Sequence, residues 1–161
     1  NAAGRPPFLR SMEFFSMGQG GRAMGKKYFT PQEANALLPL LKEDLHRLQE
    51  AKRNFIRKAI ELRQVRIRRQ MAWEKVWEEA VFRLEAEMEF LQMEAGTLIE
   101  SIRMKGAELK DIDAGLIDFP GIVEGEEVYL CWKLGEESVQ YYHGINEGYR
   151  GRKPLPSNNN G

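Results

Sequence analysis

Apolar side chains recur every three or four residues along two long stretches of the chain. This is the spacing of one face of an α-helix. The first set of positions is Ala34, Leu38, Leu41, Leu45, Leu48, Phe55, Ala59 and Leu62. The second set is Trp73, Trp77, Ala80, Leu84, Met88, Leu91, Ala95, Leu98 and Ile102. The pattern predicts two amphipathic helices, over about 31–69 and 72–105.

The start of the first helix has a clear sequence signal. Thr30 and Glu33 form the Thr-x-x-Glu pattern of a capping box, and Pro31 suits the first helical position. Pro39 lies inside the periodic stretch, so we expect either a kink or a short first turn followed by the main helix. Gly106 is the expected end of the second helix.

The join between the two helices, "RIRRQMAWEK", contains no Gly, Pro or Asn. A continuous helix would be ~110 Å long, and a hairpin that bends near residue 70 would be ~50–55 Å long. Residues 52–69 carry eight basic groups and one acidic group, whereas 74–100 carry two basic and eight acidic groups. A hairpin lays these opposite charges side by side, so we predict an antiparallel hairpin. An extended helix exchanged between two copies would satisfy the same pairing and stays open as an alternative.

The period changes from helical to alternating after Gly106. "GLIDFPGIVEG" predicts a short extended run that is broken at Pro120–Gly121, and "EEVYLCWKL" and "VQYYH" predict two strands. We therefore expect an α+β fold, mainly α, in which a long coiled-coil-like antiparallel hairpin precedes a small antiparallel β-meander over about 115–144.

The register of the last two predicted strands depends on the turn between them. A turn centred on Glu136–Glu137 would place Trp132 opposite Tyr141, and Leu130 opposite His143.

Composition limits the class of protein. The net charge is zero, the single cysteine excludes an intrachain disulfide, and no apolar run approaches the length of a membrane span. We therefore expect a cytoplasmic protein that does not associate with a membrane. Residues 1–27 and 156–161 have the composition of disordered segments, which leaves 28–155 as one domain.

Four segments in order give the chain a specific likeness. They are "YFTPQEANALLPLL", "ELKDIDAGLIDFP", "VYLCWKLGE" and "HGINEGYRGRKPL", spread over 28–155. With these segments the chain resembles the bacterial family catalogued as domain of unknown function 2203. The resemblance implies a helical pair followed by a compact C-terminal β unit, and it brings no established activity, cofactor or partner. The family often has Trp before the histidine, where this chain has Tyr142.

The region around His143 is the candidate active site. Histidine is the side chain whose ordinary pKa suits proton transfer near neutral pH, and Asp118 is a candidate to orient its ring. The candidate ligand-binding residues, with the arginines as an anion clamp, are Trp132, Tyr141, Arg150 and Arg152. The structural alternative is that His143 ends a strand, Asp118 caps the turn before Pro120, and the arginines are solvated.

A metal site would combine Cys131 and His143 with a carboxylate such as Asp118 or Glu147. The register above places Cys131 and His143 on opposite faces of the sheet, which argues against it. A slip of one residue would bring the two together. On this register we assign no metal and no cofactor.

The seams of the two helices favour a non-enzymatic protein-interaction module. A two-helix hairpin leaves apolar surface that one small sheet cannot cover, so we expect a homodimer. Trp73 and Trp77, at the predicted tip, are candidates for contact with a protein partner. We do not expect a nucleic-acid partner, since the basic run has acidic partners within the chain. The alternative is a small-ligand or enzyme site around His143.

Overall fold

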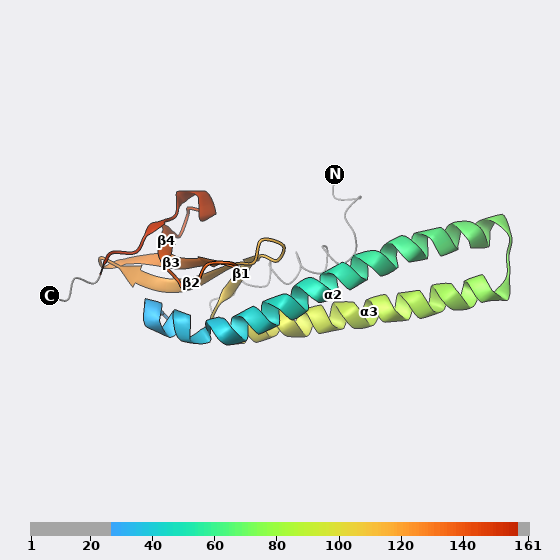
Figure 1. The fold of residues 1–161 in the computed structure, drawn as a ribbon, viewed down its shortest axis with the longest axis horizontal. Coiled ribbons are helices and arrows are strands. Elements are labelled where there is room, and N and C mark those ends of the chain that lie inside the picture. The colour runs from blue at the N-terminus through green and yellow to red at the C-terminus, as the bar shows by residue number, and fades with distance from the viewer. Residues whose placement is uncertain (1–26, 158–161) are drawn as a thin grey trace. The chain divides into compact units, whose positions relative to one another are not determined.

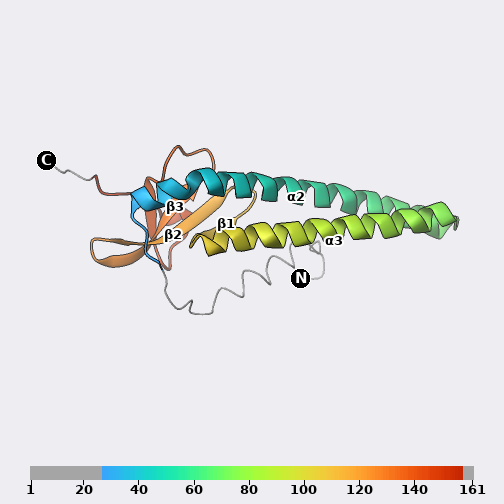
Figure 2. The same cartoon turned by 90° about the horizontal axis from the view of Figure 1, so that it is seen from below.

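The computed structural model describes residues 27–157 and confirms the helical hairpin. Helix α2 spans Pro31–Met71 and helix α3 spans Lys75–Met104. The two helices run side by side in opposite directions in both views (Figures 1 and 2). The second helix begins three residues later than predicted, so Trp73 lies in the link between the helices. The disorder predicted for the two chain ends falls almost entirely outside the described residues and stays a prediction.

The capping box forms as predicted. The backbone N–H of Glu33 donates to Thr30 Oγ1 at 3.1 Å, and the backbone N–H of Thr30 donates to Glu33 Oε1 at 3.3 Å. Helix α2 then continues without interruption through Pro39, so a short separate first turn is wrong. A proline inside a helix costs about 3 kcal/mol. Burying Leu38 and Leu41 on the same helix contributes about 1.5–3 kcal/mol each, which offsets that cost.

The described chain forms two compact units, Arg47–Leu98 and residues 27–46 with 99–157. The first unit is the part of the hairpin that includes the link between the two helices. Its core follows most of the predicted seam, and near the tip Leu62 packs with Leu84 and with Val81, which the pattern did not include. The other buried apolar residues of this unit are Leu48, Ala51, Phe55, Leu91, Ala95 and Leu98, of which Ala51 was not predicted.

Ion pairs between the helices follow the predicted segregation of charge. Lys58 Nζ lies 2.7 Å from Glu87 Oε2, and Arg66 donates to Glu85. These pairs confirm that the basic part of α2 lies against the acidic part of α3. Among residues 27–157, no helix is both long and apolar enough to cross a membrane.

The second unit contains a five-stranded antiparallel sheet whose strands follow chain order. The strands are β1 Glu108–Asp111, β2 Leu116–Val123, β3 Glu126–Lys133, β4 Tyr141–Gly144 and β5 Lys153–Pro154, with a 3-10 turn, η3, at Tyr149–Gly151. The predicted meander therefore corresponds to the three central strands. The short strands at the two edges were not predicted.

Strand β2 runs straight through Pro120–Gly121, so the predicted break there is wrong. In an antiparallel strand the N–H and C=O of one residue point to the same side. The carbonyl of Pro120 accepts a hydrogen bond from Phe29 N at 2.7 Å, on the side that faces away from β3. Strand β1 pairs with β2 only as far as Asp118, so no neighbouring strand needs an N–H from Pro120.

One face of the sheet packs on the first turns of α2. Trp132, Leu130, Ile117 and Phe119 alternate onto this face and are fully buried. Lys42 Nζ of α2 lies 5.8 Å from the centre of the Trp132 ring. The other face of the sheet carries the polar residues that the sequence singled out.

Candidate functional site

The register between β3 and β4 differs by one residue from the predicted register. Cys131 pairs with Tyr141, and Tyr129 pairs with His143. The link between the strands is longer than a tight turn, and the N–H of Val139 donates to Asn35 Oδ1 of α2 at 2.7 Å. Val139 is therefore held by the helix and lies outside the ladder between β3 and β4. The predicted pairings of Trp132 with Tyr141 and of Leu130 with His143 are wrong for this reason.

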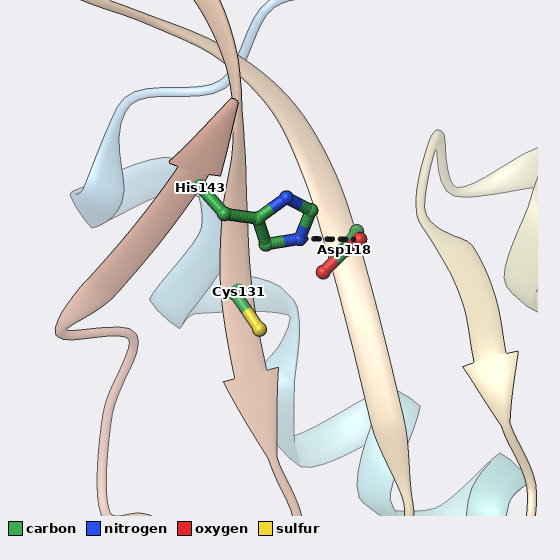
Figure 3. Close-up of side chains that lie close together, drawn as sticks. All are labelled: Asp118, Cys131 and His143. Carbon is green, nitrogen blue, oxygen red and sulfur yellow. Dashed lines mark hydrogen bonds and ion pairs between the residues drawn. The ribbon is translucent and has the colours of Figure 1, made fainter. Parts of the chain in front are cut away.

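The shifted register brings three side chains together on the sheet face opposite α2. Asp118 of β2 is the register partner of Cys131 of β3, and His143 of β4 follows on the same face. Figure 3 shows the three side chains pointing toward one another from adjacent strands. Their ligand atoms all lie within 4.8 Å of one another. We call these three residues the Asp–Cys–His cluster.

The cluster is closed to solvent. The residues Asp118, Cys131 and His143 are 2%, 0% and 3% exposed. His143 Nδ1 lies 2.9 Å from the carbonyl oxygen of Gly144, and His143 Nε2 lies 2.9 Å from Asp118 Oδ2. A carbonyl oxygen only accepts hydrogen bonds, so Nδ1 carries a hydrogen. The pair of Nε2 and Oδ2 then needs one further proton between them.

Burial determines the acid–base behaviour of the cluster. It raises the pKa of the Asp118 carboxyl, and the nearby His143 and Lys110 act in the opposite direction. Burial, with the negative charge of Asp118, also raises the pKa of the Cys131 thiol to about 12. At neutral pH the thiol therefore keeps its proton in the protein as it stands.

Arg152 covers this face of the sheet beside the cluster. Its guanidinium stacks 4.1 Å from the centre of the Tyr141 ring and 4.3 Å from that of Tyr149. Arg152 Nη1 also donates to Glu136 Oε1 at 2.9 Å. The charge of this arginine is therefore already balanced by a neighbouring carboxylate.

The structure separates the other two candidate residues from His143. Trp132 alternates onto the opposite face and is buried toward α2, where its indole N–H donates to the Glu136 carbonyl at 3.0 Å. Arg150 lies in η3 with an exposed side chain. Among the predicted site residues the fold therefore brings together Asp118, His143, Tyr141 and Arg152.

One known protein family matches the chain. The family model described as "Uncharacterized conserved protein (DUF2203)" matches residues 27–155, which is most of the chain. The chain belongs to the DUF2203 family. No curated protein and no solved structure matches it. This family description names no activity.

Two further residues of the DUF2203 chain border the cluster. The Tyr129 ring lies 5.7 Å from the His143 ring, and Lys110 Nζ lies 4.9 Å from the centre of the Tyr129 ring. Tyr129 is two residues before Cys131 on β3, so the alternating pattern of the strand could have placed it on the same face as the cluster. Lys110 lies on β1, which the sequence pattern did not predict, so no local signal pointed to it.

Burial and the raised pKa of the Cys131 thiol predict low reactivity in the native protein. A thiol reagent at neutral pH will modify the folded chain far more slowly than the chain unfolded in urea, because the thiolate is the reactive form. The rate of modification is measured from the absorbance of the chromophore that the reagent releases when it reacts with the thiol. The chain has one cysteine, so every equivalent of label reports this site. Equal rates in the two states would contradict the buried position.

A second candidate functional surface consists of exposed apolar side chains on the hairpin unit. Phe82 and Phe90 of α3 are 75% and 67% exposed. Six of them on the two helices, here called the exposed hairpin residues, are Ile56, Ile60, Ile67, Phe82, Phe90 and Met93, and Met71 and Val76 are exposed beside the link. Trp73 in the link is also 67% exposed, whereas Arg68 stacks over the half-buried Trp77 ring at 5.5 Å. Trp73 is therefore not part of the seam that the sequence pattern predicted for it.

Proposed function

We propose that this protein is a non-enzymatic assembly module whose hairpin packs against the hairpin of a second copy. The observation that carries the proposal is the exposure of Phe82 and Phe90 on α3. Burying an aromatic side chain of this size contributes about 1.5–3 kcal/mol. Large apolar groups gathered on one exposed element are typical of an interaction surface.

The exposed hairpin residues lie at similar levels on the two helices. The ion pair of Lys58 with Glu87 sets the segment around Ile56 and Ile60 against the segment around Phe90.

Charge complementarity favours a second copy as the partner. Arg57 and Arg63 of α2, and Glu78 and Glu89 of α3, are exposed and form no ion pair with another described residue. A second hairpin offers the same basic and acidic faces. Packing α2 of one copy against α3 of the other would neutralise both sets while burying the apolar residues between them.

The test is the mass of the full chain in solution, measured by light scattering over a range of micromolar concentrations. We expect a dimer for the unmodified protein. Phe90→Glu places a charge in the proposed interface and should raise the dissociation constant by at least about 30-fold, since a hot-spot contact is worth about 2 kcal/mol or more.

Ile122→Glu is the matched control, because Ile122 is an exposed apolar residue of β2, far along the chain from the hairpin tip. The control should remain a dimer. A monomeric unmodified protein at every concentration would refute the proposal, and so would a Phe90→Glu variant that dimerises like the parent.

Trp73 offers a separate contact point for a different protein. Its indole is exposed in the link at the hairpin tip, outside the proposed dimer contact. We propose that a protein partner would use Trp73 more than Trp77, since Arg68 already covers part of the Trp77 ring. Trp73→Ala should then leave the dimer intact.

A small-ligand or enzyme site around His143 has less support as the main function. The pairing of His143 with Asp118 favours it, but both side chains are buried. Arg152, the expected anion clamp, already donates to Glu136 and to the Tyr149 hydroxyl. An anion would have to displace these contacts before it could bind.

A further inference from the structure

We infer that Asp118, Cys131 and His143 form a binding site for a divalent transition-metal ion of the zinc class. The three residues supply one oxygen, one sulfur and one nitrogen, which are the donors that zinc takes in proteins. The donor atoms lie within 4.8 Å of one another, on three adjacent strands of one sheet. This inference goes beyond the proposed assembly role and does not depend on it.

The histidine is oriented as a metal ligand requires. Its Nδ1–H donates to the Gly144 carbonyl at 2.9 Å, which fixes the ring and leaves Nε2, 2.9 Å from Asp118 Oδ2, as the nitrogen that would bind the ion. A backbone carbonyl on the second ring nitrogen is the usual support of a metal-bound histidine. Nε2 points into the cluster, toward Asp118 (Figure 3).

The carboxylate has unused bonding capacity inside the cluster. Asp118 Oδ1 is buried and has no hydrogen-bond partner among the described residues. A buried polar atom without a partner costs about 1–3 kcal/mol, so such atoms call for an explanation. A cation between Asp118, Cys131 and His143 would bond this carboxylate. It would also replace the proton that the pair of Asp118 and His143 otherwise has to share.

Charge and donor type select the class of ion. A divalent ion bound by a carboxylate, a thiolate and a neutral imidazole forms a neutral group, which a buried site tolerates best. The sulfur donor disfavours Mg²⁺ and Ca²⁺, which take oxygen ligands. Two cations border the cluster: Lys110 lies near Asp118, and Arg152 is paired with Glu136 at 2.9 Å. Lys110 is also paired, with Glu108 Oε2 at 3.1 Å, so both cations are already neutralised and oppose a bound cation only weakly.

The number of protein ligands determines what kind of site this is. Structural zinc sites use four protein ligands, whereas sites with three keep a position for water or another small molecule. The described residues supply three ligands in this cluster. The site is therefore of the kind that keeps an open coordination position, and the strands hold its three ligands in place.

The experiment uses the full chain, freed of metal by dialysis against a chelator and then titrated with Co²⁺ or Zn²⁺ alone. We expect one equivalent to bind, and Co²⁺ to produce the absorption band of a thiolate–cobalt bond. Cys131→Ser should abolish that band, and His143→Gln should weaken Zn²⁺ binding at least about 100-fold, the upper end of what loss of an outer-shell partner costs. His46→Gln, at the other histidine of the chain, is the matched control and should bind like the parent.

The titration of the unmodified chain tests the site even if a variant fails to fold. Absence of Zn²⁺ binding at micromolar concentrations, or Co²⁺ binding without a thiolate band, would overturn the inference. Binding that survives both Cys131→Ser and His143→Gln, with folding confirmed by circular dichroism, would also overturn it. Mg²⁺ should not bind at these concentrations, and equal affinity for Mg²⁺ would contradict the assigned class of ion.

Discussion

Trp132→Ala will lower the free energy of unfolding by about 3–5 kcal/mol, the cost of deleting a large aromatic side chain from a packed core. Trp132 is fully buried and is the largest such side chain in the described structure. It lies on the sheet face that packs on α2, and its indole N–H donates to the Glu136 carbonyl at 3.0 Å. The substitution removes apolar contacts and leaves that carbonyl without its donor. Urea denaturation followed by far-ultraviolet circular dichroism measures the change.

Trp73→Ala is the matched control for this experiment. The same side chain is deleted at a position where it is 67% exposed. Surface substitutions of this kind usually change stability by less than about 0.5 kcal/mol. Similar losses for the two variants would contradict the assignment of Trp132 to the core and Trp73 to the surface.

Gly115→Ala will lower the free energy of unfolding by about 2–5 kcal/mol. Gly115 has φ +69°, a left-handed conformation that costs an alanine about 1–2 kcal/mol. An added Cβ would also lie 2.5 Å from Leu134 Cβ and 3.1 Å from Leu45 Cδ2. A Cβ atom cannot rotate away as the end of a long side chain can, so the backbone must move. Overpacking of this kind adds about 1–3 kcal/mol.

Gly125→Ala separates the two costs. Gly125 has φ +80°, but an added Cβ would meet nothing within 4 Å. This variant should therefore lose only the backbone term, about 1–2 kcal/mol. The difference between the two glycine variants measures the contact with Leu134. Equal losses would show that the sheet accommodates the extra methyl group at Gly115 without strain.

The two helices were predictable from the sequence alone, and the charge pattern favoured their antiparallel pairing. The apolar period of 3.6, the capping box at Thr30 and Glu33 and the segregated charges of 52–69 and 74–100 are all visible in the chain. Each depends on residues that are close in sequence or on a long, repeated pattern, so no knowledge of distant contacts is needed. The prediction was least accurate at the link, where Trp73 continues the apolar pattern although the helix begins only at Lys75.

The candidate site was predictable only in part. The sequence singled out His143 and Asp118, and the fold places them 2.9 Å apart. It also noted that a slip of one residue would join Cys131 to His143, but nothing in the local pattern chose between the two registers.

Tertiary structure made that choice through contacts between distant segments. Asn35 of α2 holds the N–H of Val139, which removes Val139 from the strand ladder and shifts β4 by one residue. The N–H of Phe29 donates to the Pro120 carbonyl on the side without a neighbouring strand. Strand β2 therefore continues through a proline at which the sequence pattern predicted a break. The periodicity of the chain thus determines which residues form helices and strands. The register, and with it the Asp–Cys–His cluster, depends on single hydrogen bonds between residues up to 104 positions apart, which no local pattern encodes.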